Sequence, residues 1–155
     1  MISEKLLIFL TAWIIENTEF NKKIDPPDFF KLSHNEMSEK ACYSSKRCKV
    51  KAYYVKDQGI FYIDVLHPEK NICDQSIILH ELIHHYQKNT TRSFNLDKET
   101  IWELRERQAL YYQNIFLISQ KRRNNNKGPE NVRQCEGGSY LDLQYKYNRS
   151  NEWVC

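Results

Sequence analysis

Two features are missing from this sequence: an apolar run long enough to cross a membrane, and a stripe of lysine and arginine interleaved with aromatic residues. The first absence excludes a membrane-spanning helix. The second, together with a net charge of only +3, gives no support to nucleic-acid binding. What is present, 41% hydrophobic and 28% charged residues, is ordinary for a soluble globular protein. The 155 residues fit one domain that buries its own core without metal or disulfide crosslinks.

The longest apolar run, over residues 6–15, has two interpretations. It has the length of the apolar part of a signal peptide, but Glu4 precedes it, Trp13 lies inside it and no small-residue cleavage site follows. We therefore predict a helix that is buried over most of its surface. The protein is then cytoplasmic if Met1 is the native start, or is numbered after removal of a leader, and the sequence leaves both open.

The cysteines lack the two-residue spacing of a zinc knuckle. Their number, five, slightly favours an oxidising compartment, periplasmic or secreted. Cys42 and Cys48 could close a short loop. Cys135 and Cys155 could tie down the C-terminal tail, which would leave Cys73 over. Five reduced thiols are the alternative, and cysteine counting does not decide between them.

The first half of the chain predicts two helices and three short strands. Residues 4–17 have a helical pattern, and the prolines within 25–28 interrupt the chain after it. A strand is expected over 29–32. A short helix should then follow over 33–40, because Ser33 and Glu36 have the spacing of a capping box. Two alternating segments, 49–55 and 59–66, predict a hairpin whose turn ends at Gly59.

The second half predicts two long helices and an irregular tail. Asp74 is expected to cap a helix over 75–88, whose apolar residues cover most of its circumference and therefore predict a buried position. Asp97 or Asn95 is expected to cap another helix that runs to about Gln120. The predicted fold class is α+β, as a single domain over 1–155 in which 121–155 form the irregular tail.

The stretch HELIHHYQ, at residues 80–87, carries the chemistry of this sequence. On a helix, His80 and His84 stack on one face and can direct two imidazoles at one point. Imidazole suits Zn²⁺ as a ligand. Glu81 lies about 100° around the helix from His80, where it is placed to act on a water as the general base of this motif.

A buried helix that spells this motif by chance is the alternative. A single helical histidine is more often packed and hydrogen-bonded than bound to metal. Here, however, three histidines and a glutamate fall in the most apolar stretch of the chain. Burying such groups is costly unless they are paired or bind a metal. The sequence therefore favours a metal site over a purely structural helix.

A catalytic zinc needs a third protein ligand and one open position. Glu106 is the predicted third ligand, because it falls on a stripe of the next helix that mixes apolar residues with one acid and one amide. Glu103 is the reserve, although solvent-exposed surface is the expected place for Glu103 and Glu99. The alternative for Glu106 is an ion pair with Arg105 or Arg107. The stripe consists of Trp102, Glu106, Ala109, Gln113 and Phe116, in which the small Ala109 would let the two helices approach.

These two motifs resemble a known family. H-E-L-I-H at 80–84, followed by E-R-Q-A at 106–109, resembles the zincin metallopeptidases and more narrowly the gluzincins, whose third ligand is the glutamate of an E-x-x-A motif. HELIHHYQ with E-x-x-A-x-x-x-Q downstream is similar to small bacterial proteins of metallopeptidase type with an HEL-x-HH-x-Q core. The resemblance covers residues 5–118. It implies a minimal zincin-like domain with one zinc on His80, His84 and Glu106, and with Glu81 as the base.

The resemblance also sets expectations for residues around the metal. Larger gluzincins often place an aspartate after the alanine to hold a ligand histidine, but Leu110 stands there, so we expect Gln113 to take that role. The strand over 59–66 is expected to be an edge strand that pairs with an extended substrate. Independently of the resemblance, Gln87 is expected to end the motif helix as a structural residue. The candidates for an oxyanion donor are Tyr111, Tyr112, Tyr140 and His67.

His85 has two open roles. It follows Glu81 by four residues and lies about 40° from it in helical projection. As a catalytic residue it would hydrogen-bond Glu81 or a substrate oxyanion. As a structural residue it would only pack or position its neighbours.

The predicted function is zinc-dependent hydrolysis of peptide bonds, in which Glu81 takes a proton from the attacking water and delivers it to the leaving amine. The expected partners are one zinc ion per chain and a peptide or protein substrate of unknown identity. The alternative is a non-catalytic zinc-containing interaction module or an inactive relative of peptidases. A closed shell of four protein ligands would favour that alternative, and an open position would favour the enzyme.

Overall fold

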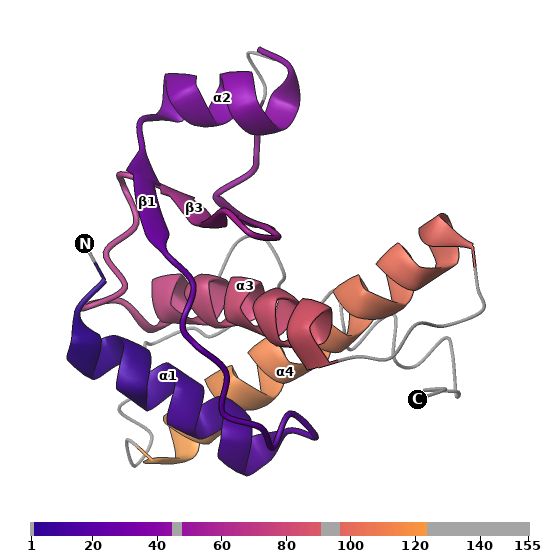
Figure 1. Cartoon of the computed structure of the whole chain (residues 1–155). Coiled ribbons are helices and arrows are strands. Elements are labelled where there is room, and N and C mark those ends of the chain that lie inside the picture. Colours follow the sequence, from indigo (N-terminus) through magenta and orange to yellow (C-terminus); the bar gives the residue numbers. More distant parts are fainter. Residues whose placement is uncertain (1, 45–47, 91–96, 124–155) are drawn as a thin grey trace.

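The structure is a computed structural model that describes residues 2–44, 48–90 and 97–123. Within those residues the chain forms four helices and a three-stranded sheet, which confirms the α+β class (Figure 1). The predicted tail beyond residue 123 and the proposed Cys135–Cys155 pair lie outside the described residues. The elements in chain order are α1 (Glu4–Asn17), β1 (Phe29–Leu32), α2 (His34–Cys42), β2 (Ala52–Val55), β3 (Gly59–Ile63), α3 (Ile72–Thr90) and α4 (Lys98–Arg123).

The first two helices begin at serine caps. The Ser3 hydroxyl accepts the N–H of Leu6 at the start of α1, and the helix has the predicted bounds. At α2 the predicted capping box is present, because the Ser33 hydroxyl accepts the N–H of Glu36 and the Glu36 carboxylate accepts the N–H of Ser33. Each reciprocal bond satisfies a backbone or side-chain group that the first helical turn leaves open.

Two of the cysteine predictions can be compared with the structure. Cys42, at the end of α2, forms a disulfide with Cys48. This bond holds the end of α2 to the segment that leads into β2. Cys73 is disulfide-bonded as well, so the expectation that it would be left over was wrong.

The sheet has the strand order β1-β3-β2. The hairpin is confirmed, because β2 and β3 pair antiparallel with Tyr53 opposite Phe61, although both strands are shorter than predicted. β1 pairs with β3 in parallel. Because β3 is paired on both sides, it is not an edge strand, and the expectation that it binds a substrate along an open edge was wrong.

Gly59, at the start of β3, is a position that requires glycine. Its φ is +125°, and a Cβ atom there would lie 2.4 Å from the carbonyl oxygen of Asp28. The N–H of Ile60 donates to that same carbonyl at 2.8 Å. The close approach of the chain before β1 to the start of β3 therefore depends on a residue without a side chain.

The motif helix α3 is longer than predicted at both ends. Asn71 rather than Asp74 caps it, since the Asn71 side-chain oxygen accepts the N–H of Cys73 at 2.8 Å. Asp74 lies inside the first turn and accepts the N–H of His67 instead. At the other end the helix continues to Thr90, so Gln87 does not end it.

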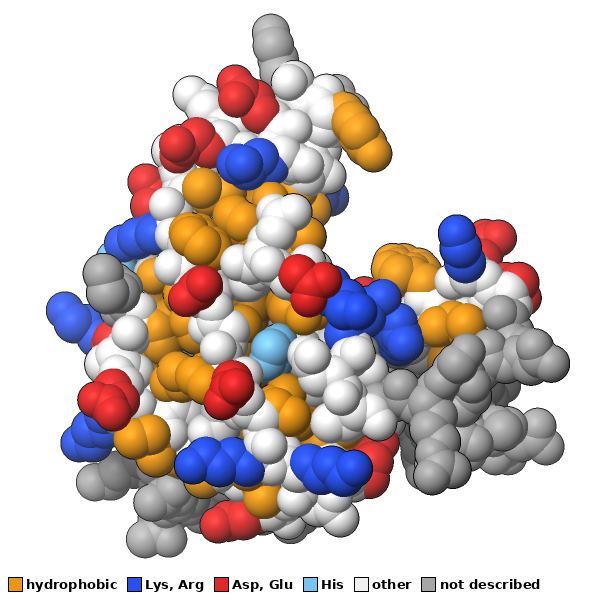
Figure 2. All heavy atoms as spheres, in the orientation of Figure 1, with side chains coloured by type: hydrophobic (Ala, Val, Ile, Leu, Met, Phe, Trp, Pro, Cys, Tyr) orange, Lys and Arg blue, Asp and Glu red, His pale blue; other side chains and the backbone are white. Residues whose placement is uncertain are grey.

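Helix α4 runs antiparallel along α3, as the contacts of Gln113 with His80 and of Gln87 with Gln108 require (Figure 1). Ala109 and Phe116 of the predicted stripe are fully buried. Trp102 is 62% exposed, so its predicted place in the core was wrong. The first turns of α4 project past the end of α3, which leaves a notch in the molecular surface between them and the sheet (Figure 2).

The core lies where α1, α3, α4 and the sheet meet. Its members are large apolar side chains of all these elements, including Ile14, Tyr62, Leu82 and Leu117. Trp13 of α1 packs edge-on against Phe116 of α4, with ring centroids 5.3 Å apart. None of the helices within the described residues is long and apolar enough to span a bilayer.

Candidate metal centre

His80 and His84 meet Glu106 at the contact between α3 and α4. The Nε2 atoms of the two imidazoles are 3.0 Å apart. Oε2 of Glu106 lies 3.4 Å from Nε2 of His80, and Oε1 lies 3.1 Å from Nε2 of His84. The three ligand atoms lie within 4.8 Å of one another, so the group could hold one metal ion. The structure therefore brings together the three residues that the sequence predicted as ligands.

The group lies at the edge of the core. The side chains of His80, His84 and Glu106 are 12%, 14% and 29% exposed. The two imidazoles are thus largely shielded by protein, while the carboxylate borders on solvent. The group is therefore open to solvent from the side of Glu106.

A glutamine of α4 fixes the orientation of His80. Nδ1 of His80 lies 3.1 Å from Oε1 of Gln113, as expected for the residue predicted to hold a ligand histidine. The Gln113 amide donates to the Ser76 hydroxyl, which donates in turn to the carbonyl of Cys73. Because the series ends at a carbonyl that can only accept, the amide oxygen of Gln113 must face His80.

A second glutamine fixes the orientation of His84. Nδ1 of His84 lies 2.9 Å from Oε1 of Gln87, and the Gln87 amide donates to the carbonyl of Arg105 and to Oε1 of Gln108. Gln87 is 1% exposed, so it belongs to the site and not to a helix end. The prediction missed this role, although a spacing of three residues places Gln87 on the same helix face as His84.

The support of His84 extends to a segment far away in the sequence. The Gln108 amide donates to the carboxylate of Glu19, which follows α1, and the Tyr112 hydroxyl donates to the same carboxylate. A carboxylate can only accept, so Glu19 fixes which way Gln108 points and hence which atom faces Gln87. No sequence pattern indicated this contact.

The orientation of both histidines has a chemical consequence. Because each Nδ1 faces an amide oxygen, each neutral imidazole carries its hydrogen on Nδ1 and a lone pair on Nε2. The two lone pairs of His80 and His84 and the carboxylate of Glu106 then converge. Three acceptors at hydrogen-bonding distance repel one another unless a cation lies between them. That cation is either a metal ion or protons that the imidazoles take up.

Without a metal ion, the pKa values of Glu106 and His84 shift in the directions that place a positive charge beside the carboxylate. Burial raises the pKa of Glu106, but the hydrogen bonds from His80 and His84 outweigh it and hold that pKa well below 4.5. Burial lowers the pKa of His84, but the hydrogen bond to Glu106 and the charge of Glu81 raise it above 6.5 overall. The site therefore keeps its carboxylate charged and favours a positive charge beside it.

Glu81 lies in the core beside the metal group, which consists of His80, His84 and Glu106. It is 7% exposed, and burial raises its pKa, while the nearby charges of His80 and His84 lower it part of the way back. The backbone N–H of Tyr54 in β2 hydrogen-bonds the Glu81 carboxylate. The motif thus places a buried carboxylate next to the two imidazoles, and the edge of the sheet holds it there.

His85 is turned toward the sheet and the chain before β1. Nε2 of His85 lies 2.8 Å from the carbonyl oxygen of Asp25, and Nδ1 lies 3.3 Å from the Tyr54 hydroxyl. These contacts favour the structural role over the catalytic one, because the two ring nitrogens contact Asp25 and Tyr54 and not Glu81. Glu103 and Glu99 are exposed, and Glu103 lies 4.0 Å from Arg107.

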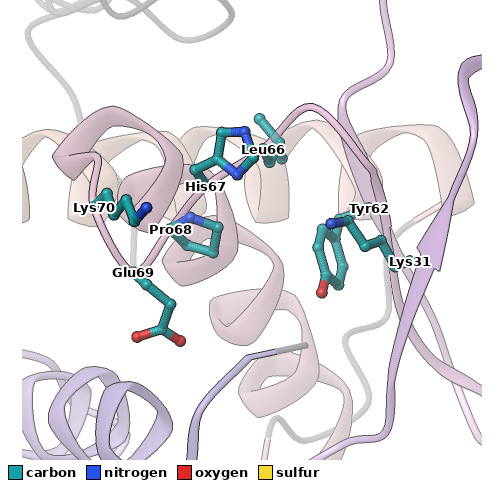
Figure 3. A pocket seen from close by; sticks show the side chains of 7 residues that line it. All are labelled: Lys31, Tyr62, Leu66, His67, Pro68, Glu69 and Lys70. Atoms are coloured by element: carbon teal, nitrogen blue, oxygen red, sulfur yellow. The ribbon is translucent and has the colours of Figure 1, made fainter.

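The predicted oxyanion donors within the described residues lie against residues that do not belong to the metal group. His67 lines a cavity of about 150 Å³ with Tyr62, Lys31 and Lys70, and none of the three metal-group residues lines that cavity (Figure 3). The Tyr112 hydroxyl is committed to Glu19. Tyr111 is 39% exposed and lies against Tyr112, and Tyr140 lies outside the described residues.

Comparison with known protein families gives one match. It covers residues 2–122, and its description is a domain of unknown function (DUF6647). The matched part includes α3, most of α4 and all three residues of the metal group. Comparison with curated proteins and with solved structures gives no match.

Proposed function

The chain belongs to the DUF6647 family, and we propose that it is a zinc-dependent metallopeptidase with a minimal zincin-like domain. One observation carries this proposal: two imidazoles with their lone pairs turned inward and one carboxylate converge between α3 and α4. Two nitrogen ligands and one oxygen ligand form a donor set typical of catalytic zinc. Zinc held by His80, His84 and Glu106 would polarise a peptide carbonyl and lower the pKa of a water molecule.

Glu81 is the proposed general base. It takes a proton from the attacking water and returns it to the leaving amine nitrogen. Burial suits it to this task, because its raised pKa makes it a better proton acceptor than an exposed carboxylate. The N–H of Tyr54 orients the carboxylate, and β2, which carries Tyr54, is one of the two edge strands of the sheet.

The number of protein ligands favours catalysis over the alternative, a zinc-containing interaction module. Within the described part of the chain, the metal group comprises three residues, whereas structural zinc sites usually have four protein ligands. A purely structural zinc also has no use for a buried carboxylate such as Glu81 next to its ligands.

The substitution Glu81→Gln tests the catalytic proposal. We expect it to retain zinc and to lower hydrolysis of a mixed peptide library by about 10²- to 10⁴-fold, the usual contribution of a general base. Zinc content and peptide cleavage are measured on the same preparation. Glu99→Gln, at an exposed glutamate of α4, is the matched control and should leave both unchanged.

Two results would count against this proposal. Full activity of Glu81→Gln would exclude Glu81 as the base. A zinc-loaded wild-type protein that cleaves no peptide in the library would favour the interaction module instead.

A further inference from the structure

Three cationic side chains from three different elements gather beside the metal centre. Lys56 lies in the turn after β2, Lys88 lies near the end of α3, and Arg105 lies on α4. Figure 2 shows lysine and arginine side chains grouped at the base of the notch between the projecting end of α4 and the rest of the molecule. The charges of Arg105 and Lys56 both act on Lys88, so segments that are far apart in the sequence contribute to one patch of positive charge.

The position of this basic patch is fixed relative to the metal group. Lys88 follows His84 by four residues and therefore lies one turn further on the same face of α3. Arg105 directly precedes Glu106, and its carbonyl accepts the Gln87 amide that also holds His84. The patch therefore borders the metal group along the contact between α3 and α4.

Within the described residues, the charges of the patch have no acidic partner. Partial desolvation, and then the like charges of Arg105 and Lys56, lower the pKa of Lys88. Among the residues that the structure describes, none of the three has an ion-pair partner, and the nearby Glu103 lies against Arg107. Nε of Arg105 is buried without a hydrogen-bond partner. Like charges held together in this way repel, and an anion bound between them would remove the repulsion.

We propose that Lys56, Lys88 and Arg105 form a carboxylate-binding subsite, so that the preferred substrate carries an acidic group close to the bond that is cleaved. This inference rests on the proposed function and adds the substrate class. The guanidinium of Arg105 suits a carboxylate because its planar N–H groups match both oxygens. The two lysines supply charge without a fixed geometry.

Peptide binding to the inactive protein tests this subsite. The probes are acetylated and amidated alanine hexapeptides with one aspartate at each position in turn, each paired with its asparagine counterpart. Binding is measured by calorimetry on the Glu81→Gln protein, so that no probe is cleaved. For at least one position we expect the aspartate peptide to bind about tenfold tighter than its partner, as for a hydrogen bond to a charged group.

Substitutions in the patch should remove this preference. In Arg105→Gln and in Lys88→Gln, the ratio of the two dissociation constants should fall below about threefold. Lys88 is exposed, so its substitution is compatible with folding even if that of Arg105 is not. Lys5→Gln, at an exposed lysine of α1, is the control and should retain the preference.

An unamidated alanine hexapeptide identifies the source of the carboxylate. If only this peptide is preferred, and the preference is lost in the same variants, the subsite binds a chain terminus, and the inference holds. Equal binding of all paired peptides together with no preference for the unamidated peptide, or a preference that survives both substitutions, would overturn it. Absence of zinc or of hydrolysis would overturn the proposed function instead, and the binding comparison would still report on the patch.

Discussion

At the scale of single residues, the metal group depends on side chains that hold its ligands. Neutral amides orient both imidazoles: Gln113 faces His80, and Gln87 faces His84. Gln113 was expected in this role because Leu110 stands where the related motif often has an aspartate that holds a ligand histidine. The sequence did not predict Gln87, because a glutamine at the end of an apolar run was taken for a helix end. The role of Gln87 depends on its burial against α4, which the sequence of α3 alone does not indicate.

The substitution Gln87→Leu should weaken zinc binding by about 10- to 100-fold, the usual effect of removing a partner of a ligand histidine. Without the amide oxygen, His84 is free to carry its hydrogen on Nε2, where it blocks the lone pair that would bind the metal. The dissociation constant is measured by competition with a chelator of known affinity.

The matched control for this substitution is Gln120→Leu. Gln120 is also a buried glutamine, at 8% exposed, but its amide contacts Ser119 rather than a ligand histidine. We expect it to bind zinc as the wild type does. Equal zinc affinity of Gln87→Leu and wild type would show that the tautomer of His84 does not depend on Gln87.

At the scale of elements, features that depend on neighbouring residues were predicted, whereas features that depend on contacts distant in sequence were not. The helix over 4–17, the strand over 29–32 and the capping box of α2 depend on neighbouring residues, and all three were predicted. The parallel pairing of β1 with β3 joins segments about thirty residues apart and leaves no local signal. Trp102 was placed in the core by periodicity alone, but α4 extends past the helix that would cover it.

The capping box of α2 should make stability depend on pH. Hydrogen bonds from the hydroxyl and the N–H of Ser33 lower the pKa of Glu36 below 4.5. A depressed carboxyl pKa stabilises the fold above the unfolded value, and this stabilisation is lost as the pH falls through the folded value. The urea midpoint of wild type should therefore exceed that of Glu36→Gln at pH 6, and the difference should shrink toward pH 3.

Comparison with Glu36→Gln removes the contributions of all other acids, because both proteins contain them. Glu39→Gln, at an exposed residue of the same helix, should show no such pH-dependent difference from wild type. A difference between wild type and Glu36→Gln that stays constant from pH 6 to pH 3 would contradict the role of the Glu36 carboxylate in the cap.

At the scale of the whole molecule, a metal ion would crosslink parts of the chain that are distant in sequence. The metal group joins α3 to α4, and the contacts of Gln87 with Gln108 and of Gln108 with Glu19 extend the connection to the segment after α1. Without an ion, the three acceptors would repel one another unless the imidazoles took up protons. Metal binding should therefore contribute to the stability of the whole fold and not only to the site.

Removal of the metal should accordingly lower the melting temperature. With free zinc at about 1,000 times its dissociation constant, binding adds about 4 kcal/mol to the free energy of unfolding. Thermal unfolding is followed by circular dichroism with and without a chelator. In Glu106→Ala the chelator should make no difference, and an equal shift in that variant and in wild type would show that zinc acts elsewhere.

The central claim is that two imidazoles of α3 and one carboxylate of α4 hold a single ion. It is tested most directly by the zinc content of purified wild type, Glu106→Ala and Glu103→Ala, measured by atomic emission. We predict about one zinc per chain in wild type and in Glu103→Ala, and loss of zinc in Glu106→Ala, because a catalytic site depends on three protein ligands. A full complement of zinc in Glu106→Ala, or no zinc in wild type, would contradict the account.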